Sequence, residues 1–519
     1  MPTFPSASRW SSPTRWPRRA AGAASTALAA AVFAVLDVVD VLLCFVYALL
    51  DGLLEDSPVR CYCHRSYDDD DGISEATAAA VNGYDQDEVS DTLYAHGRRS
   101  AVRDALLGLL RHVVGRRGRA PPDETVAPCK WRSPRWSDCA CKSCVAWMGG
   151  EGEDGGSGRL HVVKHVRALF LTLVGRFADA AGTTQSETTT TPDPENAIFV
   201  HGFTSSSSFW AETVFREASS ILDDCRLFAV DLLGFGRSPK PANCMYRVRD
   251  HVEAMERSLI EPHGLMSGSG SFHLVSHSMG CIIALALAAK HPTRVKSITL
   301  VAPVSRVRVH AHTSRQLLYL PLIVGCTCNN MQPYFLPCEQ KASQVALSRL
   351  AGKKLWPPLL FGSAVMSWYE HVGRTVCFLV CKNHLLWEWL FRLFTGNTDV
   401  DFRVRDLTKH THHSAWHTMH NVICGGAELQ DRNLEAVAAA GIPVQVVHGA
   451  DDQVVPVECS RHLKAKLPRA KLRVMDRRDH STVVLGRERD FAEELKAFWW
   501  SAASRSHVQD AEVQRQRGC

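Results

Sequence analysis

The chain has 519 residues, of which 45% are hydrophobic and 22% charged, and its formal net charge at pH 7 is +5. These proportions are normal for a globular protein, and the length leaves room for segments outside one ordinary domain. Because the charge is small and no basic run is interleaved with aromatic residues, we expect no nucleic-acid partner.

The first expected element is an apolar segment at residues 1–56. Four arginines, the last being Arg19, precede the stretch from Ala20 to Leu54, which Asp37, Asp40 and Asp51 interrupt. A positive flank before an apolar run is typical of a signal peptide or signal anchor. We therefore expect entry into the secretory pathway and association with a membrane through this segment, whether or not it is cleaved. The aspartates leave a second interpretation open, an amphipathic helix packed on the protein surface.

Residues 57–157 form a cysteine-containing region with acidic and basic runs, for which we expect partial disorder. Six of the 18 cysteines fall here: Cys61, Cys63, Cys129, Cys139, Cys141 and Cys144. In a secreted chain, disulfides of undetermined connectivity are the first interpretation. The alternative is a zinc site to which Cys129, Cys139, Cys141 and Cys144 supply four thiolates.

An α/β core is expected to begin at residue 158. The apolar runs 160–163, 197–200 and 226–230 predict buried strands. The second run leads into His201-Gly202-Phe203. The third leads into a D-x-x-G-x-G-x-S turn that begins at Asp231. This turn is structural, and it lacks the G-x-G-x-x-G helix opening that a dinucleotide site requires.

The most specific motif follows the apolar run 272–275. Ser276-His277-Ser278-Met279-Gly280 predicts a strand that turns sharply into a helix over 279–290, with Ser278 at the turn. This is the nucleophile elbow of an α/β-hydrolase, G-x-S-x-G, with Ser276 in place of the first glycine. In that fold the backbone N–H groups of Phe203 and Met279 form the oxyanion hole. We expect His201 to be structural, with at most an accessory role in shaping this loop.

After the strand at 298–303, which ends the first part of the core, the next core strand is far away. We interpret residues 304–430 as a helical cap or lid, because the stretch is too long for a simple loop. Its histidine cluster, His410, His412, His413, His417 and His420, places three side chains on one helical face, as zinc ligands can lie. No acidic residue stands at ligand spacing, so we expect packing or pocket lining instead.

The second part of the core, residues 431–501, precedes a polar tail at 502–519. An apolar strand ends in Gly449-Ala450-Asp451-Asp452, and the strand 472–476 is followed by His480. The order Ser, acid, His is that of an α/β-hydrolase triad, and the spacing favours Asp452 over Asp451 as the acid. We therefore predict an α/β-hydrolase fold with a mostly parallel sheet, flanking helices and an inserted cap. Its triad of Ser278, Asp452 and His480 would cleave acyl esters without a metal or other cofactor.

Several stretches of the chain are not required by the fold, among them Leu36–Cys44, Ser90–Tyr94, Pro134–Cys139, Lys382–His384 and Ser414–His417. In these stretches the chain resembles the plant BODYGUARD-type probable lysophospholipases. The resemblance implies the same triad, lipid-ester substrates such as lysophospholipids or cutin precursors, a role in cuticle formation, and a place at the cell surface or wall.

Other functions remain open at this point. An acyltransferase would use the same triad, although no H-x-x-x-x-D signature follows His480. A receptor of the same fold would bind a lipid or hormone with little turnover. In a third hypothesis the cysteine-rich region is the active part of an extracellular scaffold.

Overall fold

The computed structural model describes residues 35–36, 38–55, 135–149, 159–165, 194–217, 221–222, 224–242, 244–265, 270–305, 369–396 and 399–501. Cys61, Cys63, Cys129, the polar tail and most of the region expected to be partly disordered lie outside these ranges.

A seven-stranded sheet organises the described residues, in the order β1-β3-β2-β4-β5-β6-β7. The strands are β1 (Val162–His165), β2 (Glu195–Val200), β3 (Cys225–Val230), β4 (Phe272–His277), β5 (Val295–Val301), β6 (Val444–Gly449) and β7 (Lys471–Met475). Only the edge strand β1 pairs antiparallel, with β3, and the other pairs are parallel. The mostly parallel sheet expected from the sequence is thereby confirmed.

Alternate residues of the central strands enter two separate cores, one on each face of the sheet. In β2, Ile198 and Val200 belong to one core, whereas Ala197 and Phe199 belong to the other. Parallel strands are buried on both faces, which is why these strands appear in the sequence as unbroken apolar runs.

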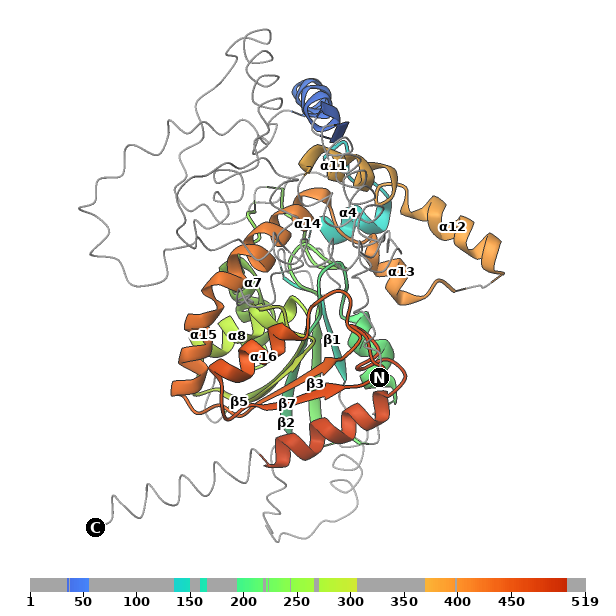
Figure 1. Ribbon diagram of the computed structural model, residues 1–519. Coiled ribbons are helices and arrows are strands. Elements are labelled where there is room, and N and C mark those ends of the chain that lie inside the picture. The colour runs from blue at the N-terminus through green and yellow to red at the C-terminus, as the bar shows by residue number, and fades with distance from the viewer. Residues whose placement is uncertain are drawn as a thin grey trace, which may run out of the picture.

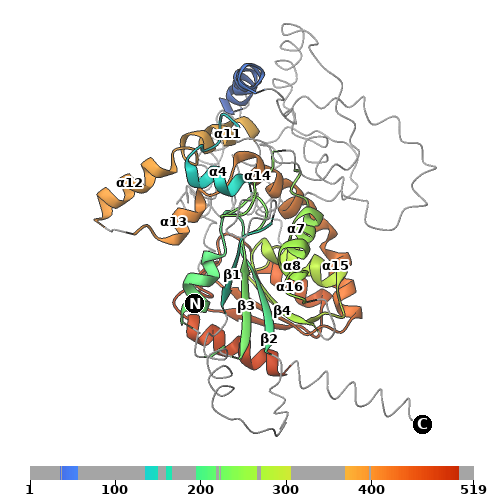
Figure 2. The same cartoon turned by 180° about the vertical axis from the view of Figure 1, so that it is seen from behind.

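Helices cover both faces (Figures 1 and 2). The first core is closed by α7 (Val248–Met255), α8 (Gly280–Lys290), α15 (Ala427–Ala439) and α16 (Glu458–Lys466). The second is closed by α6 (Ser208–Trp210), the π-helical turn η4 (Ala211–Phe215) and the C-terminal helix at 488–501. On the first face, η5 (Glu256–Ile260) continues α7. The expected boundary between cap and core at residue 430 falls inside α15.

The cap lies between β5 and β6 in the chain and covers one end of the sheet (Figure 1). Its described helices are α11 (Glu370–Leu379), α12 (His384–Thr395), α13 (Phe402–Leu407), α14 (His412–Thr418) and η7 (Met419–Gly426). Buried hydrogen bonds hold it to loops of the core. Ser206 Oγ donates to Asp406 Oδ2 at 2.5 Å, and Ser414 Oγ donates to the Gly234 carbonyl at 2.9 Å. The helical insertion of the α/β-hydrolase fold is therefore confirmed.

Three histidines of the cap lie close together on one helical face. His413, His417 and His420 are buried, with His413 Nε2 3.0 Å from the Cys244 carbonyl and His420 Nδ1 2.7 Å from the Trp416 carbonyl. The rings of His413 and His417 lie 4.1 Å apart. These contacts agree with the packing role expected for this helical face.

Residues 38–54 form a helix whose acidic residues face the cap. Asp40 Oδ1 accepts the backbone N–H groups of His371 and Val372 at 2.9 and 3.2 Å, so it caps the first turn of α11. Asp51 pairs with Arg374 through contacts of 2.6 and 2.7 Å. Burial alone would raise the pKa of Asp51, but the Arg374 guanidinium lowers it below its usual value. The aspartates therefore face protein, in agreement with the surface-helix interpretation of this segment.

Within the part of the chain that the structure describes, no helix combines the length and the apolar character needed to cross a membrane.

Candidate active site

Ser278 lies between β4 and α8 in the strained turn that the elbow requires. Its φ is +53°, and its backbone N–H donates to the Val301 carbonyl at 2.8 Å. A Cβ on Gly280 would lie 3.0 Å from the Val200 carbonyl and still closer to the His201 carbonyl, so only glycine lets the helix approach β2. Ser276, in place of the usual glycine, is fully buried with its Oγ 3.5 Å from the Thr299 carbonyl. A small side chain therefore fits there.

The loop after β2 packs directly against the nucleophile turn. A Cβ on Gly202 would lie 3.1 Å from the Ser278 Cβ, which brings the backbone around Phe203 next to the turn. His201 is buried and holds this loop in place. Its Nε2 accepts the Leu232 N–H at 2.9 Å, and its Nδ1 donates to the Gly202 carbonyl at 2.7 Å. Burial lowers the pKa of His201, so this histidine is a neutral structural group.

The structure brings Asp452 to His480, with Asp452 Oδ2 2.8 Å from His480 Nδ1. Asp452 is buried in the turn after β6, and its Oδ1 accepts the N–H groups of Val454 and Val455, both at 2.8 Å. Burial would raise the pKa of Asp452, but hydrogen bonds from His448, His480 and the backbone hold it well below the usual value. Asp452 is therefore a carboxylate at neutral pH. Asp451, the alternative acid, is exposed.

Two further histidines at the site were not singled out from the sequence. His448 is fully buried, and its Nε2 lies 3.2 Å from Asp452 Oδ2 and 3.0 Å from the Val455 carbonyl. Because both neighbours are acceptors, Nε2 carries the hydrogen, and Nδ1 then accepts from Ser460 Oγ at 2.6 Å. His448 therefore orients the carboxylate from the side opposite the Val454 N–H.

His277 connects the elbow to the loop that carries His480. Its Nε2 donates to the His480 carbonyl at 2.9 Å, and its ring stacks on Phe209 with centroids 4.7 Å apart. Burial and the nearby His480 lower the pKa of His277 to about 3, so it stays neutral at physiological pH. This hydrogen bond thus joins the elbow to the His480 loop. The sequence signal that could have found them is their position within the motifs, since His277 stands next to Ser278 and His448 stands four residues before Asp452.

Comparison with known proteins finds a matching family model and curated relatives. Residues 198–322 match the family model described as alpha/beta hydrolase fold. Probable lysophospholipase BODYGUARD 4 of Arabidopsis thaliana is 41% identical over 94% of this chain and 99% of its own length. Probable lysophospholipase BODYGUARD 5 of the same plant is 36% identical over 92% of this chain and 96% of its own. Among solved structures, the esterase EaEST of Exiguobacterium antarcticum covers 67% of this chain and 97% of its own, with 16% identity and a TM-score of 0.39, which is too distant to support an argument.

Identity above 30% along nearly the whole length of both chains is what members of one family show. The chain therefore belongs to the BODYGUARD family of probable lysophospholipases, and it is an ester hydrolase of the α/β-hydrolase fold.

Proposed function

We propose that this protein cleaves the acyl ester of a lysophospholipid or related lipid through Ser278, His480 and Asp452. Ser278 Oγ attacks the ester carbonyl while His480 Nε2 takes its proton. The tetrahedral oxyanion accepts hydrogen bonds from the N–H groups of Phe203 and Met279. On collapse, His480 returns the proton to the leaving alcohol, and Ser278 keeps the acyl group. Water then attacks the acyl-enzyme and gives its proton to His480. As this second tetrahedral intermediate collapses, His480 returns the proton to Ser278 Oγ and the fatty acid leaves.

The hydrogen bond between Asp452 and His480 is the observation that carries this proposal. Because the carboxylate only accepts, His480 Nδ1 must carry the hydrogen, which leaves the Nε2 lone pair available as a base. The two backbone N–H groups on Asp452 Oδ1 fix the carboxylate in this orientation. The His277 bond fixes the backbone of His480 relative to the nucleophile turn.

The substrate class follows from the relatives, which are named probable lysophospholipases. The family resemblance extends this to hydroxy-fatty-acid esters used in cuticle formation, with the protein acting at the cell surface or wall. Both substrates present a long acyl chain next to a polar alcohol, so an apolar surface near the cap would suit either one.

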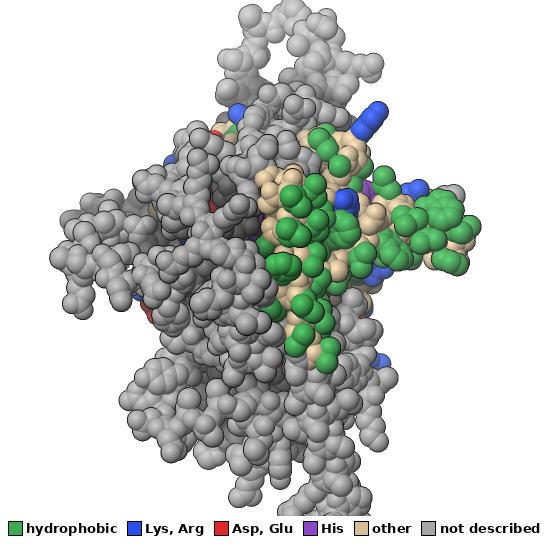
Figure 3. All heavy atoms as spheres, turned by 90° about the horizontal axis from the view of Figure 1, so that it is seen from above, with side chains coloured by type: hydrophobic (Ala, Val, Ile, Leu, Met, Phe, Trp, Pro, Cys, Tyr) green, Lys and Arg blue, Asp and Glu red, His purple; other side chains and the backbone are tan. Residues whose placement is uncertain are grey.

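We further propose that the protein associates with a lipid surface through exposed apolar side chains. The helix at 38–54 turns its acids inward and leaves one apolar face in solvent, and α12 also exposes apolar side chains, which form a separate group in the same view (Figure 3). The side chains concerned are Leu42, Phe45, Val46, Leu49, Leu53, Leu385, Leu386, Trp389, Leu393 and Phe394, each at least 40% exposed. Exposed groups of large apolar side chains are typical of an interaction site.

Product analysis tests the activity. The full-length protein is incubated with lysophosphatidylcholine, and free fatty acid is measured for wild type, Ser278→Ala and Ser276→Ala. Ser276→Ala is the matched control, since it removes a neighbouring serine of the same motif. We expect hydrolysis to be lost only in Ser278→Ala. Equal activity in wild type and Ser278→Ala would contradict the mechanism, and acyl transfer to an added alcohol in preference to water would indicate an acyltransferase.

Liposome sedimentation tests the lipid contact. Replacing Phe45 and Leu49 together by glutamate is expected to abolish sedimentation with phosphatidylcholine vesicles, while hydrolysis of a short-chain, soluble ester stays unchanged. Sedimentation equal to that of wild type would contradict the assignment of this face.

A further inference from the structure

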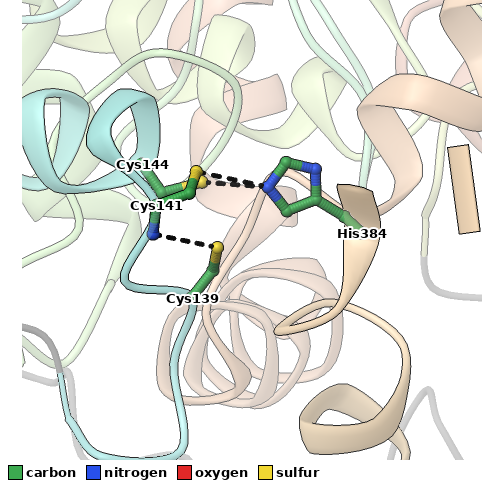
Figure 4. A group of neighbouring side chains, drawn as sticks. All are labelled: Cys139, Cys141, Cys144 and His384. Carbon is green, nitrogen blue, oxygen red and sulfur yellow. Dashed lines mark hydrogen bonds between the residues drawn. The ribbon is translucent and has the colours of Figure 1, made fainter. Parts of the chain in front are cut away.

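Three cysteines and a histidine converge on one point above the core (Figure 4). Cys139, Cys141 and Cys144 belong to the segment at 135–149, which contains α4 (Lys142–Gly149). His384 is the first residue of α12 in the cap and is buried. The three sulfur atoms and a ring nitrogen all lie within 4.8 Å of one another. Four soft or borderline ligand atoms that converge in this way are the donor set of a structural zinc site.

The distances agree with tetrahedral zinc. With Zn–S near 2.3 Å and Zn–N near 2.05 Å, a tetrahedral angle places sulfur and nitrogen about 3.6 Å apart. His384 Nε2 lies 3.6 Å from Cys141 Sγ and 3.5 Å from Cys144 Sγ. A neutral S–H···N hydrogen bond would account for one such contact, but one nitrogen cannot satisfy several thiols in this way.

The surroundings prepare each ligand for a metal. His384 Nδ1 lies 3.1 Å from Glu388 Oε1, one turn further along α12. The carboxylate keeps the hydrogen on Nδ1 and leaves the Nε2 lone pair directed at the sulfur atoms. This is the partner that zinc-bound histidines usually have. The backbone N–H of Cys141 donates to Cys139 Sγ at 3.5 Å, as expected for a thiolate.

We propose that Cys139, Cys141, Cys144 and His384 bind one zinc ion that joins the segment 135–149 to the cap. Four protein ligands leave no position for substrate or water, so the ion is structural. It connects residues 240 positions apart in the chain. Protein contacts make the same connection nearby, where Lys382 Nζ donates to the Trp136 carbonyl at 2.6 Å. The zinc ion therefore holds the cap in a defined place above the active site.

This assignment changes the zinc alternative derived from the sequence. Cys129 was the expected fourth ligand but lies outside the described residues, and His384 takes that place. The three cysteines are unpaired in the structure, so the geometry favours thiolates over disulfides at these positions. A second group, Cys377, Cys381 and His410, offers three ligands among the described residues, with His410 Nε2 3.8 and 3.6 Å from the two sulfur atoms. The test must separate the two groups.

Zinc content per chain, measured by mass spectrometry on the purified full-length protein, tests the proposal. We expect Cys141→Ser and His384→Ala each to lose one equivalent of zinc relative to wild type. Cys225→Ala, which removes a buried cysteine of β3 outside both groups, should keep the wild-type content. X-ray absorption at the zinc edge of the wild type should report a shell dominated by sulfur with nitrogen.

Three results on the wild-type protein would overturn the assignment, and a fourth concerns the variants. A folded wild-type protein without zinc would do so, as would zinc with a shell of only oxygen and nitrogen. A disulfide between two of Cys139, Cys141 and Cys144 in the folded protein, found by peptide mapping, is the third. If the variants fold and keep their zinc, the metal lies elsewhere and this site is also excluded.

Discussion

Replacing Asp452 by asparagine separates the catalytic role of this carboxylate from its structural one. The side chain accepts two backbone N–H groups on Oδ1, while His480 and His448 face Oδ2. Asparagine has one acceptor oxygen and one NH₂ group, so one of the two sides must meet a donor.

The structure decides which side that is. If the NH₂ group faced the backbone, two buried donors would lose their acceptor, at about 1–3 kcal/mol each. If it faces the histidines, His480 can move its hydrogen from Nδ1 to Nε2, and His448 keeps its bond to the Val455 carbonyl. The second orientation is therefore preferred. It leaves the fold intact but places a hydrogen on the nitrogen that must accept the Ser278 proton.

We therefore expect Asp452→Asn to lower kcat by about 10⁴-fold with a small loss of stability. Hydrolysis of a chromogenic ester gives kcat, and thermal unfolding reports the fold. Asp451→Asn is the matched control, because this exposed neighbour should change kcat little. A folded Asp452→Asn protein with kcat within tenfold of wild type would refute the argument, and so would an equal loss in Asp451→Asn.

Three further predictions concern packing and charge. Gly202→Ala should lower kcat much more than stability, because its Cβ would lie 3.0–3.1 Å from atoms of the nucleophile turn; unchanged kcat would show that this approach is not tight. Arg374→Ala should cost about 1.5–3 kcal/mol of unfolding free energy, since it removes the Arg374 bonds to the buried Asp51 carboxylate, which keeps its contacts with Arg135 and the Trp136 N–H. Arg392, whose side chain is 50% exposed, lies 3.7 Å from Glu388, and Arg392→Ala should cost less than about 1 kcal/mol in the same denaturation assay. Equal losses in Arg374→Ala and Arg392→Ala would contradict this difference. Because folding lowers the pKa of Asp452, the ionised carboxylate stabilises the folded protein fully above the unfolded pKa of about 3.9, and this stabilisation is lost as the pH falls below that value. The unfolding free energy of Asp452→Asn, measured as a function of pH, should lack this contribution, and an unchanged acid dependence would contradict it.

The sequence was sufficient for the sheet and for the nucleophile turn because their signals are local. Strands buried on both faces are apolar along their whole length, and the close approach of α8 to β2 requires Gly280. The candidate acid and base could be located because the order of motifs along the chain follows the order of strands in this fold.

Other features depend on contacts between distant residues and have no local signal. Asp40 looked unfavourable in an apolar helix, and Asp51 interrupts the same stretch. Their partners His371 and Arg374 lie more than 300 positions away, so no local signal shows how the two acids are paired. Cys381 stands three positions before His384, but this local spacing does not mark His384 as a partner of Cys139, Cys141 and Cys144, because Cys144, the nearest of them in the chain, lies 240 positions away. The role of His277 depends on the loop that crosses it, which belongs to a different part of the core.

The central claim is that Ser278 is an activated nucleophile, and covalent labelling tests it most directly. The full-length protein is treated with a fluorophosphonate, and the modified residue is identified by peptide mass spectrometry. The account predicts one adduct, on Ser278, that disappears in Ser278→Ala and persists in Ser276→Ala. A folded wild-type protein without an adduct, or with the adduct on another residue, would contradict it.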